Sequence, residues 1–210
     1  MGRTGPTPGG TPTHFPGFDV LEQADHWDDV TRAAVLARLE TPQPLRFFTA
    51  DEEPTASALL DQLLDQRSEP RVPVLAMIDQ RLADCETDGW HYDDLPPDSE
   101  AWRASLRGLD REAEVAHGRR FADCDWLEQS AIIAHVQDLG SESWHDLPAG
   151  KLWSLWTRYA GTAFYSHPYA WNEIGFSGPA YPRGYKNATV GGREPYEVPE
   201  QDPQDPVIGS

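Results

Sequence analysis

Apolar residues recur at intervals of three and four positions in six separate stretches of this chain. That spacing places them on one face of a helix. No stretch shows the alternation of polar and β-branched residues that is typical of a strand. A chain of 210 residues is long enough to bury a core. The sequence therefore predicts an all-α fold, an irregular bundle of about six helices with a long aromatic C-terminal loop and extended tails.

Start and stop signals bound these helices. The first is expected from Asp25 to the residues before Pro42, with Trp27 and Val30 on its apolar face. In the second, Thr49 and Glu52 have the spacing of a capping box. The remaining four are expected to begin at Val74, at Ser99, at Asp123 or Asp125, and at Leu147, and to end near Cys85, Gly118, Gly140 and Phe164.

The stretch from Phe164 to Asn187 holds seven aromatic residues, three prolines and three glycines. Prolines remove backbone donors and glycines permit unusual backbone angles, so we expect an ordered, irregular loop that is neither a plain helix nor a strand. Aromatic and arginine side chains dominate the centres of protein interfaces. Trp171, Tyr181, Arg183 and Tyr185 are therefore candidate anchors for a partner. The alternative is that these aromatic rings plug one end of the helical core.

The formal net charge of −18 argues against binding to nucleic acid or to an anionic membrane, because both are polyanions. No run approaches the roughly 18 apolar residues that a membrane helix needs, so we expect no direct membrane insertion. Residues 1–17 are rich in Gly, Pro and Thr and are expected to be a disordered tail without a signal peptide. The helical domain is expected over residues 18–187, followed by an extended tail, rich in Pro and acid, over residues 188–210.

Few residue patterns suggest chemistry within the chain itself. Cys85 and Cys124 form no CxxC motif, and we expect both to be buried thiols. The spacing of His135, His145, His167 and Glu173 is not that of helical metal ligands. We expect His135 to be a core residue and His167 to cap the end of the sixth helix. No nucleophile elbow, phosphate-binding loop or dinucleotide motif is found, so neither catalytic nor cofactor residues are expected.

The C-terminal segment FYSHPYAWNEIGFSGPAYPRGY resembles the ending of the gluconate 2-dehydrogenase subunit 3 family. The segments LRFFTADEEPTASALLDQLL, VPVLAMIDQRL and WRASLRGLD are similar to the family's helical part, so that the resemblance covers roughly residues 45–187. It implies a non-catalytic small subunit whose large partner, a dehydrogenase of the glucose-methanol-choline oxidoreductase type, holds FAD and oxidises a sugar or alcohol. Some complexes of this type add a cytochrome subunit.

By position, the resemblance implies that the C-terminal motif faces the partner or defines the loop. The interface residues expected from it are His167, Trp171, Asn172, Glu173, Phe176, Tyr181 and Tyr185, with Gly175, Gly178, Pro179, Pro182 and Gly184 shaping the backbone. The hot-spot argument above adds Arg183 to this interface. Many family members carry a twin-arginine signal at the N-terminus, whereas this chain has a Pro and Gly tail. We therefore expect a cytoplasmic complex, or a periplasmic one exported on a partner's signal.

Two other functions remain open from the sequence. One is a stand-alone carbohydrate-binding or carbohydrate-modifying protein whose pocket is lined by Trp153, Trp156, Trp171 and His167, because aromatic walls suit sugar rings. The other is a transient assembly factor that leaves the mature complex. Activity of the purified single chain would favour the first, and absence from the mature complex would favour the second.

Overall fold

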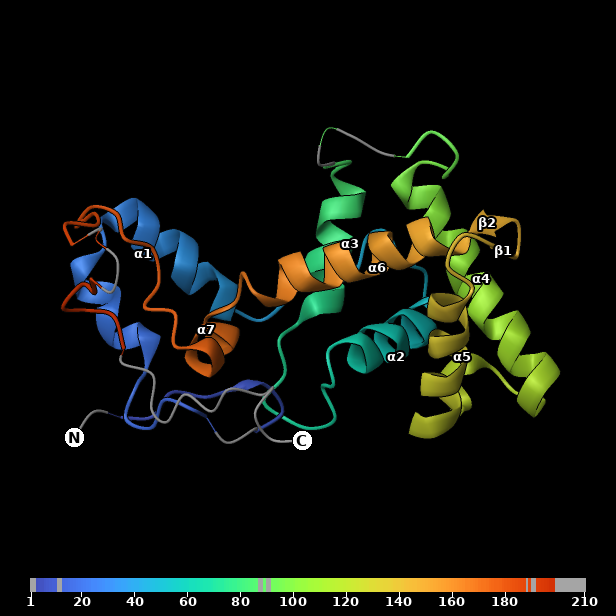
Figure 1. Ribbon diagram of the computed structural model, residues 1–210, viewed down its shortest axis with the longest axis horizontal. Coiled ribbons are helices and arrows are strands. Elements are labelled where there is room, and N and C mark those ends of the chain that lie inside the picture. The colour runs from blue at the N-terminus through green and yellow to red at the C-terminus, as the bar shows by residue number, and fades with distance from the viewer. Residues whose placement is uncertain are drawn as a thin grey trace. The chain divides into compact units, whose positions relative to one another are not determined.

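The computed structural model describes residues 3–10, 13–86, 89, 92–187, 189 and 192–198 (Figure 1). The chain divides into two compact units. Unit 1 contains residues 1–41, 68–72 and 165–210, and unit 2 contains residues 42–67 and 73–164. Each unit therefore brings together segments that are far apart in the sequence.

Unit 2 is helical, which confirms the predicted fold class. Its elements are α2 (Glu53–Leu63), α3 (Val74–Ala83), α4 (Asp98–His117), the short 3₁₀ helix η4 (Phe121–Asp123), α5 (Trp126–Asp138), β1 (Ser143–Trp144), β2 (Leu147–Pro148) and α6 (Ala149–Phe164). Helix α6 packs against α3, α4 and α5 (Figure 1). Trp102, Trp156 and Tyr159 are fully buried in this unit, and the rings of Trp102 and Tyr159 meet edge to face at 5.9 Å.

Several predicted helix ends of unit 2 are confirmed. Asp125 and Glu128 form a capping box at the start of α5, where the Asp125 carboxylate accepts from the Glu128 N–H group at 3.0 Å. Gly118 ends α4 with a left-handed φ of 68°. In the Thr49–Glu52 pair, the Thr49 N–H group donates to the Glu52 carboxylate at 3.0 Å. Local hydrogen bonds of this kind need no tertiary partner, which is why the sequence reveals them.

Other helix details differ from the predictions. Helix α4 begins at Asp98 without a side-chain cap from Ser99. The Asp98 carboxylate instead accepts from the Tyr159 hydroxyl at 2.7 Å. Helix α5 buries Ile133 and leaves His135 exposed, so the prediction that His135 is a core residue is wrong. The neighbouring helices pack against a face of α5 that differs from the one that the spacing indicated.

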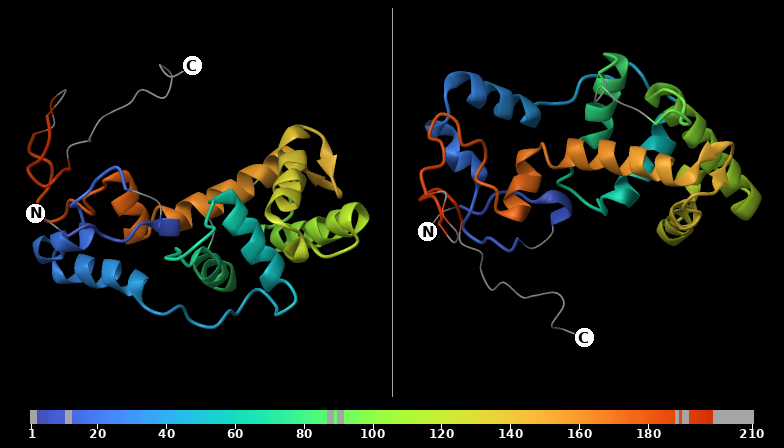
Figure 2. Two further views of the ribbon diagram at one scale, coloured as in Figure 1. Left: turned by 90° about the horizontal axis from the view of Figure 1, so that it is seen from below. Right: turned by 45° about the horizontal axis from the view of Figure 1, so that its top comes forward.

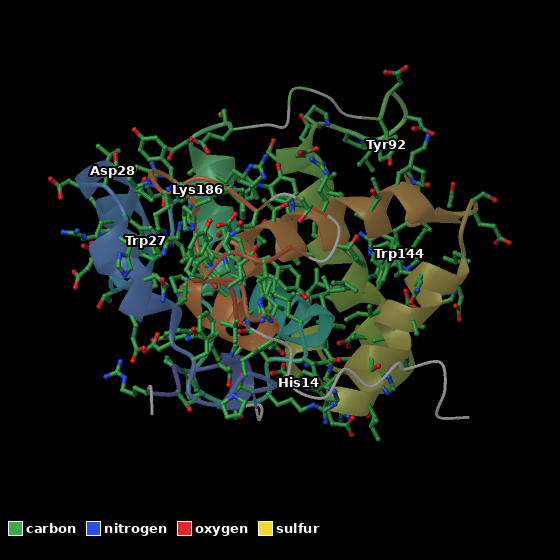
Figure 3. All side chains as sticks on the ribbon, turned by 60° about the vertical axis from the view of Figure 1, so that its left-hand side comes forward. His14, Trp27, Asp28, Tyr92, Trp144 and Lys186 are labelled. Carbon is green, nitrogen blue, oxygen red and sulfur yellow. The ribbon has the colours of Figure 1, made fainter. Side chains whose placement is uncertain are left out.

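A hairpin replaces the expected start of the sixth helix. Strand β1 pairs antiparallel with β2, and Trp144 lies opposite Leu147. His145 and Asp146 make the two-residue turn with φ of 47° and 65°, the left-handed angles that such turns require. The ring of Trp144, labelled in Figure 3, packs on α4 at Gly108, where a Cβ atom would come within 2.6 Å of the ring. Burial of Trp144 thus holds the hairpin onto the helices.

Unit 1 joins both ends of the chain. Its elements are the 3₁₀ helices η1 (Pro8–Gly10), η2 (Val20–His26) and η3 (Ala37–Leu39), and the α-helices α1 (Asp29–Leu36) and α7 (Pro168–Ile174). The single helix expected from Asp25 is therefore broken, because Trp27 is extended and the Asp28 carboxylate caps α1 at the Thr31 N–H group, 2.9 Å away. In both views of Figure 2, the red C-terminal loop lies beside the blue N-terminal segments of this unit.

The N-terminal segment is packed where the sequence predicts a disordered tail. Within residues 3–10 and 13–17, the Gly5 N–H group donates to the Phe18 carbonyl at 2.8 Å and the Gly9 N–H group to the Pro70 carbonyl at 2.8 Å. Thr7 is buried. These contacts come from distant parts of the chain, which composition does not reveal. Of the tail expected over residues 188–210, only residues 189 and 192–198 are among those the structure describes.

Candidate partner-binding site

The aromatic C-terminal stretch contains a short helix, α7, instead of being irregular throughout. Pro168 occupies the first turn, where a helix does not need its missing N–H group. The Nδ1 atom of His167 accepts from the Tyr169 N–H group at 3.2 Å and so caps the start of α7. Gly175 ends the helix with φ of 68°. His167 was expected to cap the preceding helix, and that prediction is wrong.

Trp171 anchors this helix in the core of unit 1. It is buried among Phe18, Val20, Trp27 and Val35. Its Nε1–H group donates to the Tyr165 carbonyl at 2.7 Å, so the indole carries no unsatisfied donor into the core. Trp171 therefore holds α7 in the core of unit 1.

Asn172 joins the N-terminal part of the chain to α7. Its Oδ1 atom accepts from the Val20 N–H group at 2.8 Å, and its Nδ2 group donates to the Pro6 carbonyl at 3.0 Å. The Thr13 hydroxyl donates to the Asn172 carbonyl at 3.2 Å. One buried amide thus satisfies backbone groups on two segments, which gives Asn172 a structural role within the unit.

His167 is almost completely enclosed. Because Nδ1 accepts a hydrogen bond, Nε2 carries the proton and donates to the Arg38 carbonyl at 3.0 Å. The pKa of His167 is lowered from 6.5 to about 4, mainly by burial; the hydrogen bond to the Arg38 carbonyl opposes this shift, and the Arg38 guanidinium adds to it. The imidazole is therefore neutral near pH 7 and serves as a structural group.

The segment after α7 turns outward. Tyr181, Tyr185 and Phe176 are 65%, 59% and 38% exposed. Phe176 also packs edge to face on the buried Trp171 ring at 5.3 Å, so the exposed aromatic surface rests directly on the core. Glu173 is half-buried, and burial raises the pKa of its carboxyl group.

Residues 184–187 and 194–197, which we call the C-terminal loop, are linked by hydrogen bonds next to this surface. The buried Glu194 carboxylate accepts from the N–H groups of Lys186 and Asn187. The Tyr196 hydroxyl donates to the Gly184 carbonyl at 3.0 Å. One carboxylate and one hydroxyl therefore link the two segments of the loop.

A cavity of about 570 Å³ opens between the end of α7 and this loop. Its walls include Phe176, Ser177, Tyr185, Arg193 and Tyr196. The Ser177 hydroxyl is buried and has no hydrogen-bond partner. Aromatic walls with a few polar groups are typical of recognition pockets.

The eight predicted interface residues thus fall into two groups. His167, Trp171 and Asn172 point into unit 1, where they hold α7 and the N-terminal segment. Glu173, Phe176, Tyr181, Arg183 and Tyr185 are half-buried or exposed and form what we call the docking surface. The sequence analysis did not predict that Ser177, Arg193 and Tyr196 contribute to the wall of this cavity. The one signal that could have indicated it is the presence of an arginine and a tyrosine close together at positions 193 and 196.

The alternative carbohydrate pocket is not assembled from the residues expected. Trp156 packs in the core of unit 2, with its Nε1–H group donating to the Ser105 hydroxyl at 3.1 Å. Trp171 and His167 are buried in unit 1. Among the described residues, no group of three His, Cys, Asp or Glu side chains is arranged to hold a metal ion.

Unit 2 contains a second conspicuous cluster in the segment that resembles the family's opening motif. The buried Asp79 carboxylate accepts from the N–H groups of Arg46, Phe47 and Phe48 at 2.7, 2.8 and 2.8 Å. Arg103 stacks on the Phe47 ring at 4.3 Å. Asp79 therefore fixes the turn that leads into α2.

Comparisons with known proteins agree with this architecture. The family model described as gluconate 2-dehydrogenase subunit 3 matches residues 50–178, more than half of the chain. The match covers unit 2 from Ala50 onward, together with α7, and ends at Gly178, before the exposed Tyr181 and Tyr185. The searches of curated proteins and of solved structures found no significant match.

In the part of the chain that the structure describes, no helix is long and apolar enough to cross a membrane. The family match supports the resemblance found in the C-terminal and helical motifs. The chain therefore belongs to the gluconate 2-dehydrogenase subunit 3 family, which implies a subunit of a multi-subunit dehydrogenase complex.

Proposed function

We propose that the chain is a non-catalytic small subunit that binds, folds and stabilises a large FAD-dependent dehydrogenase subunit. The partner is of the glucose-methanol-choline oxidoreductase type, holds the FAD and oxidises a sugar or alcohol. Family membership supports the assignment to a dehydrogenase complex. The observation that carries the proposal is the docking surface, which presents the exposed aromatic residues Phe176, Tyr181 and Tyr185, the first of them packed on the buried Trp171.

Rigid support matters for affinity. An aromatic side chain on a mobile loop loses conformational entropy on binding, whereas one that is already ordered loses less. Phe176 is ordered by its contact with Trp171, and Tyr185 lies 6.4 Å from the Tyr196 ring across the closed loop. The surface therefore combines large apolar area with preorganisation, the properties of an interface hot spot.

Purification of the tagged chain from its native host tests the proposal. We expect a larger polypeptide to co-purify and to show flavin absorbance in the visible spectrum. Tyr181→Ala combined with Tyr185→Ala should reduce recovery of that polypeptide about tenfold or more, because hot-spot aromatics each contribute on the order of 2 kcal/mol. A colourless chain that purifies alone would contradict the proposal.

Leu127→Ala provides a matched control for the tyrosine variant. Leu127 is 78% exposed on α5 of unit 2 and does not belong to the docking surface. Its removal should leave recovery of the partner unchanged. Equal losses for the control and the tyrosine variant would show that the docking surface does not direct the interaction.

A further inference from the structure

Cations gather near the docking surface without carboxylate partners. The whole chain has 35 acidic residues against 17 Lys and Arg, so an arginine here usually finds an acid. Arg46 pairs with Asp84 at 2.8 Å, and Arg120 with Asp110 at 3.1 Å. Among the described residues, three cations in the C-terminal part of unit 1 form no such ion pair: Arg183, Lys186 and Arg193.

The nearby carboxylates are already engaged. Glu194 is buried, and its carboxylate accepts from the backbone N–H groups of Lys186 and Asn187. The Glu197 carboxylate accepts from the Glu194 N–H group at 2.6 Å. These acids hold the loop closed instead of neutralising Lys186 and Arg193, whose side chains remain exposed. Lys186 is labelled on this loop in Figure 3.

The cavity places apolar and polar groups beside these cations. Arg193 is part of its wall together with the rings of Phe176 and Tyr185. The Ser177 hydroxyl, also in the wall, is buried without a partner. A ligand that carries both apolar surface and a carboxylate would therefore complement the charge of Arg193 and supply an acceptor for Ser177.

From this charge complementarity we infer that the docking surface receives an acidic segment of the partner subunit, with carboxylates at Lys186 and Arg193 and an apolar side chain in the cavity. The inference rests on the proposed function and adds the chemistry by which the partner is recognised. Opposite charges at the rim of an interface speed association and fix its register. A strongly acidic subunit can thus bind an acidic segment because Lys186 and Arg193 are exposed and form no ion pair with a described carboxylate.

Arg183 has a different position from the other two cations. Its guanidinium lies 3.8 Å from the centre of the Tyr196 ring, and its Nη1 group donates to Gln23 Oε1 at 2.9 Å. Its Nε and Nη2 groups are buried without an acceptor. These groups are not open to an incoming carboxylate, whereas the side chains of Lys186 and Arg193 are exposed. Lys186 and Arg193 are therefore the residues to test.

The test measures affinity between the full chain and the purified flavin-containing partner at about 50 mM and about 500 mM NaCl. In Lys186→Glu combined with Arg193→Glu, we expect affinity to fall about tenfold or more at the lower salt concentration, with a much smaller loss at the higher one. The affinity of the neutral variant, with Gln at both positions, should lie between that of the unchanged chain and that of the double Glu variant. Both side chains are exposed, so helical content and unfolding midpoint should match those of the unchanged chain.

Arg107→Glu combined with Arg111→Glu is the matched control, because it changes the net charge equally on the exposed face of α4 in unit 2. A loss confined to the Lys186 and Arg193 variants would support the inference. Equal losses in both pairs would overturn it, since overall charge would then explain the effect. Unchanged affinity with the partner still bound would also overturn it and assign the cations to another occupant, such as the chain's own acidic residues 200, 202 and 205.

Failure of the proposed function has a different signature. If no flavin-containing partner is recovered with the unchanged chain, the proposed function fails and the inference falls with it. If the partner is recovered and the charge variants bind it as well as the unchanged chain does, only the inference is overturned.

Discussion

The Nε2–H group of His167 donates to the backbone carbonyl of Arg38 at 3.0 Å, and this bond joins the start of α7 to the segment that follows α1. The same ring caps α7 through Nδ1. A protonated imidazole has no acceptor nitrogen, so protonation removes the cap. The geometry of unit 1 therefore depends on a neutral histidine.

Acid should destabilise unit 1 through His167. Its folded-state pKa is about 4, below the ordinary value of 6.5, so the unfolded chain binds this proton more readily. Stability should be fully present above pH 6.5, fall as the pH drops from 6.5 toward 4, and lose about 3 kcal/mol in total. Urea unfolding across this pH range would measure it. His167→Gln, which cannot titrate, should show a shallower pH dependence, and identical slopes would contradict the prediction.

Removal of the Asp79 carboxylate should destabilise unit 2 strongly. Asp79→Ala leaves the N–H groups of Arg46, Phe47 and Phe48 without their acceptor, which we expect to cost about 2 to 5 kcal/mol. Asp84→Ala serves as control, because it removes only an exposed ion pair with Arg46 and should cost far less. The free energy of unfolding from urea titration compares the two. Similar losses would show that the buried carboxylate has no special role.

Gly178 should tolerate a methyl group less well than Gly184. Both have a positive φ, 77° and 69°, so alanine is strained at both by roughly 1 to 2 kcal/mol. At Gly178 a Cβ atom would also lie 2.5 Å from the Trp27 ring, whereas at Gly184 nothing lies within 4 Å. We expect Gly178→Ala to cost about 1 to 3 kcal/mol more than Gly184→Ala. Thermal unfolding of the two variants would measure the difference, and equal melting temperatures would refute the steric argument.

The two cysteines should differ in reactivity. The sequence predicts that both are buried, but Cys85 is exposed and only Cys124 is buried. Burial raises the pKa of the Cys124 thiol, which further disfavours the reactive thiolate. Titration with a thiol reagent should label Cys85 in the folded chain and Cys124 only after denaturation. Labelling of both residues at the same rate without denaturant would contradict the assigned burial.

Local signals explain most of what could be predicted. The helix cap at Asp125, the glycine stop at Gly118 and the apolar face of α6 involve residues within a few positions of one another, and each appears in the structure as expected. The family resemblance is likewise carried by contiguous motifs and is supported by the match over residues 50–178. The docking surface itself was predicted from composition, and its role remains a proposal.

The sequence by itself determined the helical class, the main helix ends and the family, because periodicity, caps and motifs act over short distances along the chain. Only the tertiary structure decided which side chains of the aromatic stretch are available to a partner. Trp171 and Tyr181 are both large aromatic residues of one motif, but Phe18, Val20 and Trp27 pack around the first and leave the second exposed. Which of the two residues is buried depends on contacts between segments more than 140 positions apart, so no local pattern predicts it.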